Sequence, residues 1–350
     1  MWLKFLDNIQ RYLFFWVIGA ITLGLLQVLY FGGYPFSPLI CLLAALVMIY
    51  PSLVPLSFGN LKQAVKKYNI IIISVFLNFV LAPLLAVLIG YIFLQNYPIL
   101  WLGLILLSLL PGGGMVTTWA LKSRANMSTT VGIIFFNFLA AILIAPFVLS
   151  FAFNKLGTNV LSYSKEEACG LSEASSGVVS CGLGGDGVTP IKIALPVFFI
   201  VVVPLALAYF TQKTIKAKKG SEYFEKNKRF FGEFSNLGLI VVLFILMSLE
   251  NNSILFSEPQ LIFKSLIALV LFYFMTLVMP LFLYKKFFNN SDGKALIWGS
   301  YLRYITLALG LGISLIYGNN NLSGMVIIIV LSYFIQIPVS FWLTNYLKNN

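Results

Sequence analysis

The sequence predicts an all-α polytopic membrane protein of ten transmembrane helices, arranged as an inverted five-plus-five repeat. Three observations support this fold class: the composition, a regular succession of long apolar segments, and an uneven distribution of Lys and Arg between those segments. Of the 350 residues, 60% are hydrophobic and only 10% are charged. A soluble core cannot bury that much apolar surface, so we expect the chain to fold in lipid.

The apolar segments are bounded by Gly, Pro, Asn and charged residues. A helix needs roughly 20 apolar residues to cross the hydrocarbon core of a bilayer. The first segment is expected to remain as a span, because no small-residue cleavage site follows it. The ten predicted spans are 11–31, 37–56, 69–95, 98–122, 127–153, 191–212, 234–256, 261–284, 295–317 and 323–347.

Lys and Arg are concentrated on one side of this predicted topology. Alternate segments between the spans place 18 of them on one side and four on the other. The positive-inside rule assigns the richer side, with both termini, to the cytoplasm. The net charge of +12 therefore reflects topology, since the basic residues form no stripe interleaved with aromatics as in nucleic-acid binding. We expect membrane lipid but no nucleic acid as a partner, in the plasma (inner) membrane of a prokaryote.

A polar insert divides the chain into two halves. Residues 1–153 form the predicted first repeat and residues 191–350 the second. Because each half has an odd number of spans, the second half is inverted, as in many transporters. The insert, 154–190, is the predicted extracytoplasmic loop. It contains Cys169 and Cys181, which either form a disulfide or remain free thiols.

The strongest local feature is the run from Pro111 to Met115, which contains three consecutive glycines in the middle of span four. Proline lacks a backbone donor and glycine makes a helix easy to unwind. We therefore expect a discontinuity that frees peptide groups for an ion or a solute, with a simple kink or close helix packing as the alternative. The hydroxyls of Thr117 and Thr118 follow the run, and they either line the site or bond back to their own helix.

Arg303 lies inside span nine, where a charged side chain costs about 2.5–3.5 kcal/mol on insertion scales. All eleven acidic residues lie in loops or near span ends, so no carboxylate partner is expected at that depth. Backbone carbonyls, water or a bound anion must then neutralise the guanidinium. The alternative is an arginine that snorkels to the cytoplasmic surface.

Two amides are predicted to lie within the membrane. Asn78 belongs to span three and Asn137 to span five. Buried amides need partners in lipid, and either a solute or a neighbouring helix can supply them. The two halves also echo each other weakly: Pro83 with Pro280, and Asn137 with Gln336.

The chain lacks the residues that several classes of function require. The chain has no His and no intramembrane acid, so it lacks a proton relay, a metal site and the acid–base pair of an intramembrane enzyme. It also lacks a Walker motif for nucleotides. We expect a non-enzyme that contains no metal and is driven by a gradient or a partner subunit. The rival class is a membrane sensor that binds a ligand without moving it.

The sequence resembles the bile acid:sodium symporter superfamily, and within it the arsenite efflux permease branch. The similarity is spread over nearly the whole membrane region. The residues that carry it are Asn78, Pro83, Pro111, Gly112, Gly113, Met115, Val116, Trp119, Asn126, Met127, Ser128 and Pro146.

This resemblance implies a ten-span fold in which broken helices four and nine cross at the centre. It also implies that a panel of spans 1, 2, 6 and 7 moves against a core of spans 3–5 and 8–10. One branch of the superfamily carries organic anions with sodium, and the other exports arsenite. The chain departs from these patterns in two respects.

The departures concern the coupling ion and the metalloid. Carried over by position, the candidate sodium ligands are Asn78, Thr117 and Thr130. The Glu and Gln that symporters place on span nine correspond to Gly299 and Arg303, which disfavours ordinary sodium sites because a cation beside an arginine is repelled.

We predict a secondary active transporter that moves a small organic anion by alternating access. Sodium is the one candidate cofactor, and whether it is coupled is left open. The alternatives are an arsenite or metalloid efflux permease, disfavoured by Gly112 where those permeases carry a cysteine, and the sensor. The predicted substrate-binding residues are Arg303, Gly113, Gly114, Thr118, Thr306 and Asn137.

Overall fold

The computed structural model describes residues 12–32, 38–55, 64–156, 189–248, 259–288, 290–316 and 322–349. These residues are almost entirely helical, and the described part contains no strand. The all-α prediction is confirmed. Cys169 and Cys181, with most of the predicted extracytoplasmic loop, lie outside the described residues.

The helices follow the predicted apolar segments. Those of the first half are α2 (Leu13–Phe31), α3 (Pro38–Leu53), α5 (Tyr68–Phe76), the π-helical turn η2 (Leu77–Leu81), α6 (Ala82–Phe93), α7 (Pro98–Leu109), α8 (Gly114–Lys122) and α9 (Met127–Leu156). Those of the second half are α11 (Pro190–Lys219), α12 (Ser221–Met247), α14 (Pro259–Phe287), α15 (Ser291–Tyr301), α16 (Ile305–Ile316) and α17 (Leu322–Asn349).

Five of the described helices are long and apolar enough to cross a membrane by themselves. They are Val65–Phe93, Met127–Leu156, Ile193–Lys219, Gln260–Phe287 and Gly324–Asn349. Large apolar side chains cover the outside of the bundle; Phe147 and Phe151 of α9, for example, are about two-thirds exposed. Such a surface is stable in lipid and not in water. The chain is an integral membrane protein.

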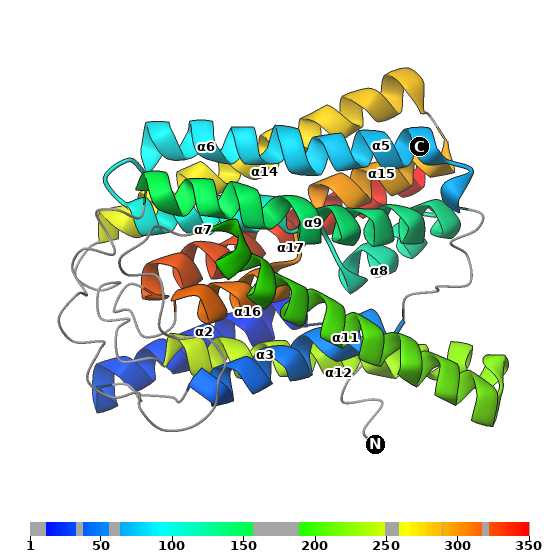
Figure 1. Cartoon of the computed structure of the whole chain (residues 1–350), viewed down its shortest axis with the longest axis horizontal. Helices are drawn as coiled ribbons and strands as arrows, with labels where there is room; N and C mark the ends of the chain where they lie inside the picture. The colour runs from blue at the N-terminus through cyan, green and yellow to red at the C-terminus, as the bar shows by residue number, and fades with distance from the viewer. Residues whose placement is uncertain are drawn as a thin grey trace.

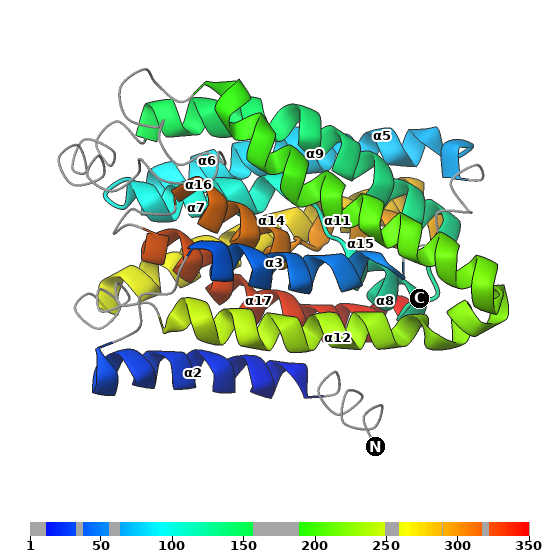
Figure 2. The same ribbon diagram turned by 60° about the horizontal axis from the view of Figure 1, so that its bottom comes forward.

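The helices form two groups with a buried layer between them. Helices α2, α3 and α12 lie along one side of the bundle, whereas α5, α6, α14 and α15 lie along the opposite side (Figure 1). Within the groups, α12 packs on α2 and α3, and α14 packs on α6 and α15. Between them, α7 is buried throughout from Leu100 to Leu109. Figure 2 shows that α2 begins and α17 ends toward the same end of the bundle.

The predicted spans three and six differ in detail from the helices. The helix of span three continues without interruption from Tyr68 to Phe93, short of the predicted end at 95. Its π turn, η2, ends one residue before the turn that contains Pro83, because Pro83 lacks the N–H and crowds the carbonyl of the preceding turn. Segment 213–233, predicted to lie between spans six and seven, is also helical. Only Gly220 separates α11 from α12, with a φ of +85° that favours glycine.

Candidate functional site

Two helices are interrupted next to each other in the middle of the bundle. Residues 110–113 separate α7 from α8, and residues 302–304 separate α15 from α16. The two segments run antiparallel, with a backbone bridge between Pro111 and Arg303. The discontinuity predicted at Pro111 is thus present. The crossing brings together the carbonyl ends of α7 and α15 and the N–H ends of α8 and α16, whose peptide groups lack helical partners.

The glycines of the first break allow a close approach of three elements. A Cβ on Gly113 would lie 2.5 Å from the ring of Tyr304, and one on Gly114 would overlap the carbonyl oxygen of Ser52 in α3. These two predicted substrate-binding residues therefore border Tyr304 and α3. Close packing, one of the readings that the sequence left open, is part of their role.

Arg303 is buried, with 3% of its surface exposed. Its Nη1 donates to Oδ1 of Asn78 at 2.8 Å and to the carbonyl of Ser108 at 3.0 Å, and its Nη2 donates to the carbonyl of Ser300 at 3.0 Å. The guanidinium also lies 5.6 Å from the ring centroid of Phe272. It does not snorkel. Among the described residues no carboxylate pairs with it, and its Nε has no hydrogen-bond partner.

Asn78 joins Arg303 to the neighbouring helices. It lies in η2, and its Nδ2 donates to the carbonyl of Gly299 at 3.0 Å and to the hydroxyl of Ser74 at 3.3 Å. Asn137 of α9 donates to the same hydroxyl at 3.0 Å, while its Oδ1 has no hydrogen-bond partner in the described part of the chain. Asn78 and Asn137, predicted from sequence, are thus brought together with Arg303 in one buried polar network.

Gln336 of α17 holds the second break in place. Its Oε1 accepts from the backbone N–H of Arg303 at 2.9 Å and from the hydroxyl of Tyr273 at 2.9 Å, and its Nε2 donates to the carbonyl of Arg303 at 3.2 Å. The amide thereby replaces the helical partners that the interruption removes. The sequence marked Gln336 only as an echo of Asn137, and the role of this side chain was missed.

The threonines lie apart from this network. Thr117 donates to the carbonyl of Gly114 at 2.7 Å, and Thr130 donates to the carbonyl of Asn126 at 2.8 Å. Both hydroxyls therefore bond to a carbonyl of the preceding turn, which for Thr117 is one of the two outcomes that the sequence left open. No contact among the described residues joins either of them to Asn78. Two further predicted residues are the half-buried Thr118 of α8 and the buried Thr306 of α16.

Tyr304 connects the crossing to the opposite group of helices. Its hydroxyl is hydrogen-bonded to the hydroxyl of Ser52 in α3, and its ring stacks on Phe138 of α9 with centroids 5.8 Å apart. Nothing in the sequence pattern singled out this tyrosine. Its position next to Arg303 would have been the available signal.

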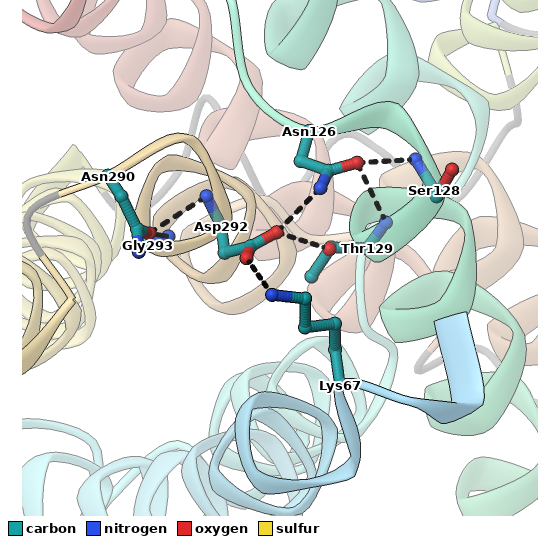
Figure 3. Close-up of polar contacts among 7 residues, drawn as sticks. All are labelled: Lys67, Asn126, Ser128, Thr129, Asn290, Asp292 and Gly293. Atoms are coloured by element: carbon teal, nitrogen blue, oxygen red, sulfur yellow. Dashed lines mark hydrogen bonds and ion pairs between the residues drawn. The ribbon is translucent and has the colours of Figure 1, made fainter. Parts of the chain in front are cut away.

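A second polar cluster lies at the end of the bundle where α15 begins (Figure 3). Asp292 forms an ion pair with Lys67 at 2.9 Å, and its Oδ1 accepts from Nδ2 of Asn126 at 2.8 Å and from the hydroxyl of Thr129 at 2.5 Å. One carboxylate therefore ties α15 to the start of α9 and to the residue that precedes α5.

Two asparagines cap the helices that meet in this cluster. Oδ1 of Asn126 accepts from the backbone N–H of Ser128 at 3.0 Å, and Oδ1 of Asn290 accepts from those of Asp292 and Gly293, both at 3.0 Å. These bonds satisfy N–H groups that have no partner inside the helix. They fix the outer end of α15, the helix whose inner end carries the second break.

Asp292 precedes the predicted span nine and remains a carboxylate. Burial raises the pKa of Asp292, but the hydrogen bonds from Thr129, Lys67 and Asn126 and the charge of Lys67 outweigh burial, and the pKa is lower than usual. The cluster therefore depends on a negative charge at neutral pH.

Comparison with known proteins shows which family and which relatives the chain resembles. The Sodium Bile acid symporter family matches residues 42–168. The Arsenical-resistance protein Acr3 of Corynebacterium glutamicum is 25% identical over 288 residues, which cover 77% of this chain and 70% of that protein. Acr3 of Alkaliphilus metalliredigens is 26% identical over 273 residues, covering 71% and 68%. The chain is thus similar to the Sodium Bile acid symporter family over residues 42–168 and to arsenical-resistance proteins over most of its length.

A third relative is an uncharacterized transporter of Synechocystis sp., 26% identical over 329 residues, or 86% of this chain and 76% of that protein. The resemblance seen in the sequence is therefore confirmed, including its arsenite permease branch. The family match ends at residue 168. It thus includes Asn78 and the first break, whereas Arg303 and Gln336 lie beyond it.

Proposed function

We propose that the chain is a secondary active transporter that moves a small organic anion by alternating access. Its fold is ten spans in an inverted repeat of residues 1–153 and 191–350, joined by the extracytoplasmic loop 154–190. Both termini lie in the cytoplasm of a prokaryote, and the protein resides in the plasma membrane. The relatives support transport of a small solute, because two are named arsenical-resistance proteins and one a transporter.

The observation that carries the choice of an anion is the buried charge of Arg303. Arg303 is 3% exposed, and no carboxylate among the described residues neutralises its guanidinium. Its Nε–H is an unused donor. A buried cation attracts an anion strongly where the surroundings are poorly polarisable. A carboxylate or other oxyanion would therefore bind in the crossing more strongly than a neutral solute.

The N–H ends of the half-helices also favour a negatively charged solute. Helices α8 and α16 begin at the crossing, and the start of a helix carries a partial positive charge. Gly113, Gly114, Thr118 and Thr306 lie at or near these two starts, and Asn137 adds a buried amide. We assign these residues, with Arg303, to the substrate site.

We assign the moving parts from the two groups of helices. Helices α2, α3, α11 and α12 form the panel, and α5 to α9 with α14 to α17 form the core. The contact between Ser52 and Tyr304 then lies on the boundary between them. Breaking and remaking contacts of this kind would expose the crossing to each side of the membrane in turn.

Uptake into liposomes tests this function. The purified chain is reconstituted and supplied with labelled organic mono- and dicarboxylates, or with arsenite, with and without a sodium gradient. We expect saturable uptake of at least one carboxylate. The Thr118→Val variant should lower this uptake about tenfold, the value of one hydrogen bond to a charged group, whereas Thr22→Val on the exposed face of α2 should not.

Arsenite efflux is the second candidate, because two relatives are Acr3 proteins. Saturable arsenite flux without carboxylate flux in the same liposomes would establish it and overturn the anion assignment. A sensor is the third candidate. Specific binding of a carboxylate without any flux would establish that reading instead.

A further inference from the structure

Three oxygen atoms from three separate elements converge on the guanidinium of Arg303. The carbonyl of Ser108 comes from the last turn of α7, the carbonyl of Ser300 from the last turn of α15, and the side-chain oxygen of Asn78 from η2. All three lie 2.8–3.0 Å from a guanidinium nitrogen. We call these atoms the oxygen cage.

The oxygen cage has the features of a cation site. The C-terminal end of a helix carries a partial negative charge, and two such ends meet here because α7 and α15 are both interrupted. Carbonyl and amide oxygens at broken helices are ligands for alkali ions in membrane transporters. Gly299 extends the arrangement, since its carbonyl orients the Asn78 amide at 3.0 Å and so turns Oδ1 toward the guanidinium.

We propose that the oxygen cage is a cation-binding site whose permanent occupant is the tethered guanidinium of Arg303. A free sodium ion cannot bind to the same oxygens, since the guanidinium occupies the site between them and repels a second cation. One consequence of this inference rests on the proposed transport function. If the chain transports an anion, it does so without sodium bound at the crossing. Asn78, a predicted sodium ligand, instead binds the arginine.

Chemical rescue of a truncated arginine tests the occupancy directly. The Arg303→Ala variant removes the guanidinium and leaves the three oxygens buried and unpaired. Thermal unfolding is followed in nanodiscs in sodium, potassium or choline chloride at one ionic strength, and then with guanidinium chloride at low millimolar concentration, far below its denaturing range. Arg124→Ala serves as the control, because Arg124 is exposed.

We expect the Tm of the wild type to be the same in the three chloride salts. The Tm of Arg303→Ala should be lower, and guanidinium should raise it by about 2 °C or more, as expected when a ligand binds only the folded state. Guanidinium should have no such effect on the wild type or on Arg124→Ala. A folded Arg303→Ala variant that responds to guanidinium no more than to choline would overturn the proposal. So would a wild type that sodium stabilises over potassium.

A matched pair of variants covers the case in which Arg303→Ala does not fold. Arg303→Lys keeps a positive charge within reach of the oxygens, and Arg303→Met keeps a side chain of similar length without charge. The lysine variant should be the more stable of the two and should remain insensitive to sodium. Equal stability, or a more stable methionine variant, would contradict a cation site.

These measurements need no substrate and no flux. Failure of the liposome assay with successful rescue would therefore remove the transport function and leave the tethered cation standing. Anion uptake without rescue would do the opposite.

Discussion

Two of the three hydrogen-bond acceptors of the Arg303 guanidinium are backbone carbonyls, which side-chain identity does not reveal. The sequence located Arg303, Asn78 and the first break, because a charge, an amide and a Pro-Gly run are unusual within apolar segments. It did not locate the carbonyls of Ser108 and Ser300 as the partners. Backbone oxygens become ligands only where helices end, and which carbonyls meet depends on how two distant breaks cross.

Gln336 is the side chain whose removal we expect to be most damaging near the crossing. Replacing it with Met leaves the buried N–H and C=O of Arg303 without their side-chain partner, and each unmade bond costs about 1–3 kcal/mol. The Gln336→Met variant should therefore lose about 2–5 kcal/mol of unfolding free energy, measured by denaturant titration in detergent. Gln260→Met on the exposed start of α14 is the matched control. A loss equal to that of the control would show that the amide does not hold the break.

Asp292 gives the stability of the protein a defined pH dependence. Its carboxylate contributes fully above the ordinary pKa of Asp, about 3.9, and the contribution is lost as the pH falls through the lowered pKa of the folded state. The advantage in Tm of the wild type over Asp292→Asn should thus be constant from about pH 6 to pH 5 and shrink as the pH falls below about 4. The exposed Glu222→Gln is the control. A Tm difference between wild type and Asp292→Asn that stayed constant below pH 4 would contradict the ion-pair cluster.

The helices show which element boundaries follow from local sequence. The break at the Pro-Gly run that begins at Pro111 was readable, since glycine and proline act through their own backbone. The break at residues 302–304 contains neither residue, and only the family resemblance indicated it. The structure accounts for it by tertiary partners, chiefly Gln336. The helical structure of residues 213–233, between the predicted spans six and seven, was missed because a polar helix lacks the apolar signal of a span.

Gly114 tests whether α8 must approach α3 closely. A Cβ at this position overlaps the backbone of Ser52, and overpacking of this kind costs about 1–3 kcal/mol. Gly114→Ala should therefore destabilise the protein and slow any flux. Gly19→Ala is the matched control, because nothing lies within 4 Å of its added Cβ and alanine favours a helix by about 0.5–1 kcal/mol. Equal thermal stability of the two variants would show that the approach is not required.

For the whole molecule, the apolar composition predicted the lipid environment, and the long apolar segments predicted the all-α class. The division of the helices into a panel and a core is implied by the family resemblance and stays a prediction; the described contacts show only that α12 packs on α2 and α3. The fold does not determine which end of the bundle faces the cytoplasm. The predicted orientation rests on the distribution of Lys and Arg, and it needs its own test.

Labelling of single cysteines in a variant without native cysteines tests the orientation. We expect Lys218→Cys, at the exposed end of α11, to react with an impermeant maleimide only when the cytoplasmic side is accessible. Asn96→Cys, exposed between α6 and α7, should react only from outside. The positive-inside rule predicts this pattern. The reverse pattern would invert the proposed topology.

The measurement that tests the central claim most directly is carboxylate uptake by wild type and Arg303→Lys against Arg303→Met in sodium-free liposomes. Wild type should take up the anion without sodium, the lysine variant should retain part of that rate, and the methionine variant should lose at least about tenfold, the value of one charged hydrogen bond. Unchanged uptake by Arg303→Met, or uptake by wild type only in a sodium gradient, would contradict an anion carrier built around a tethered cation.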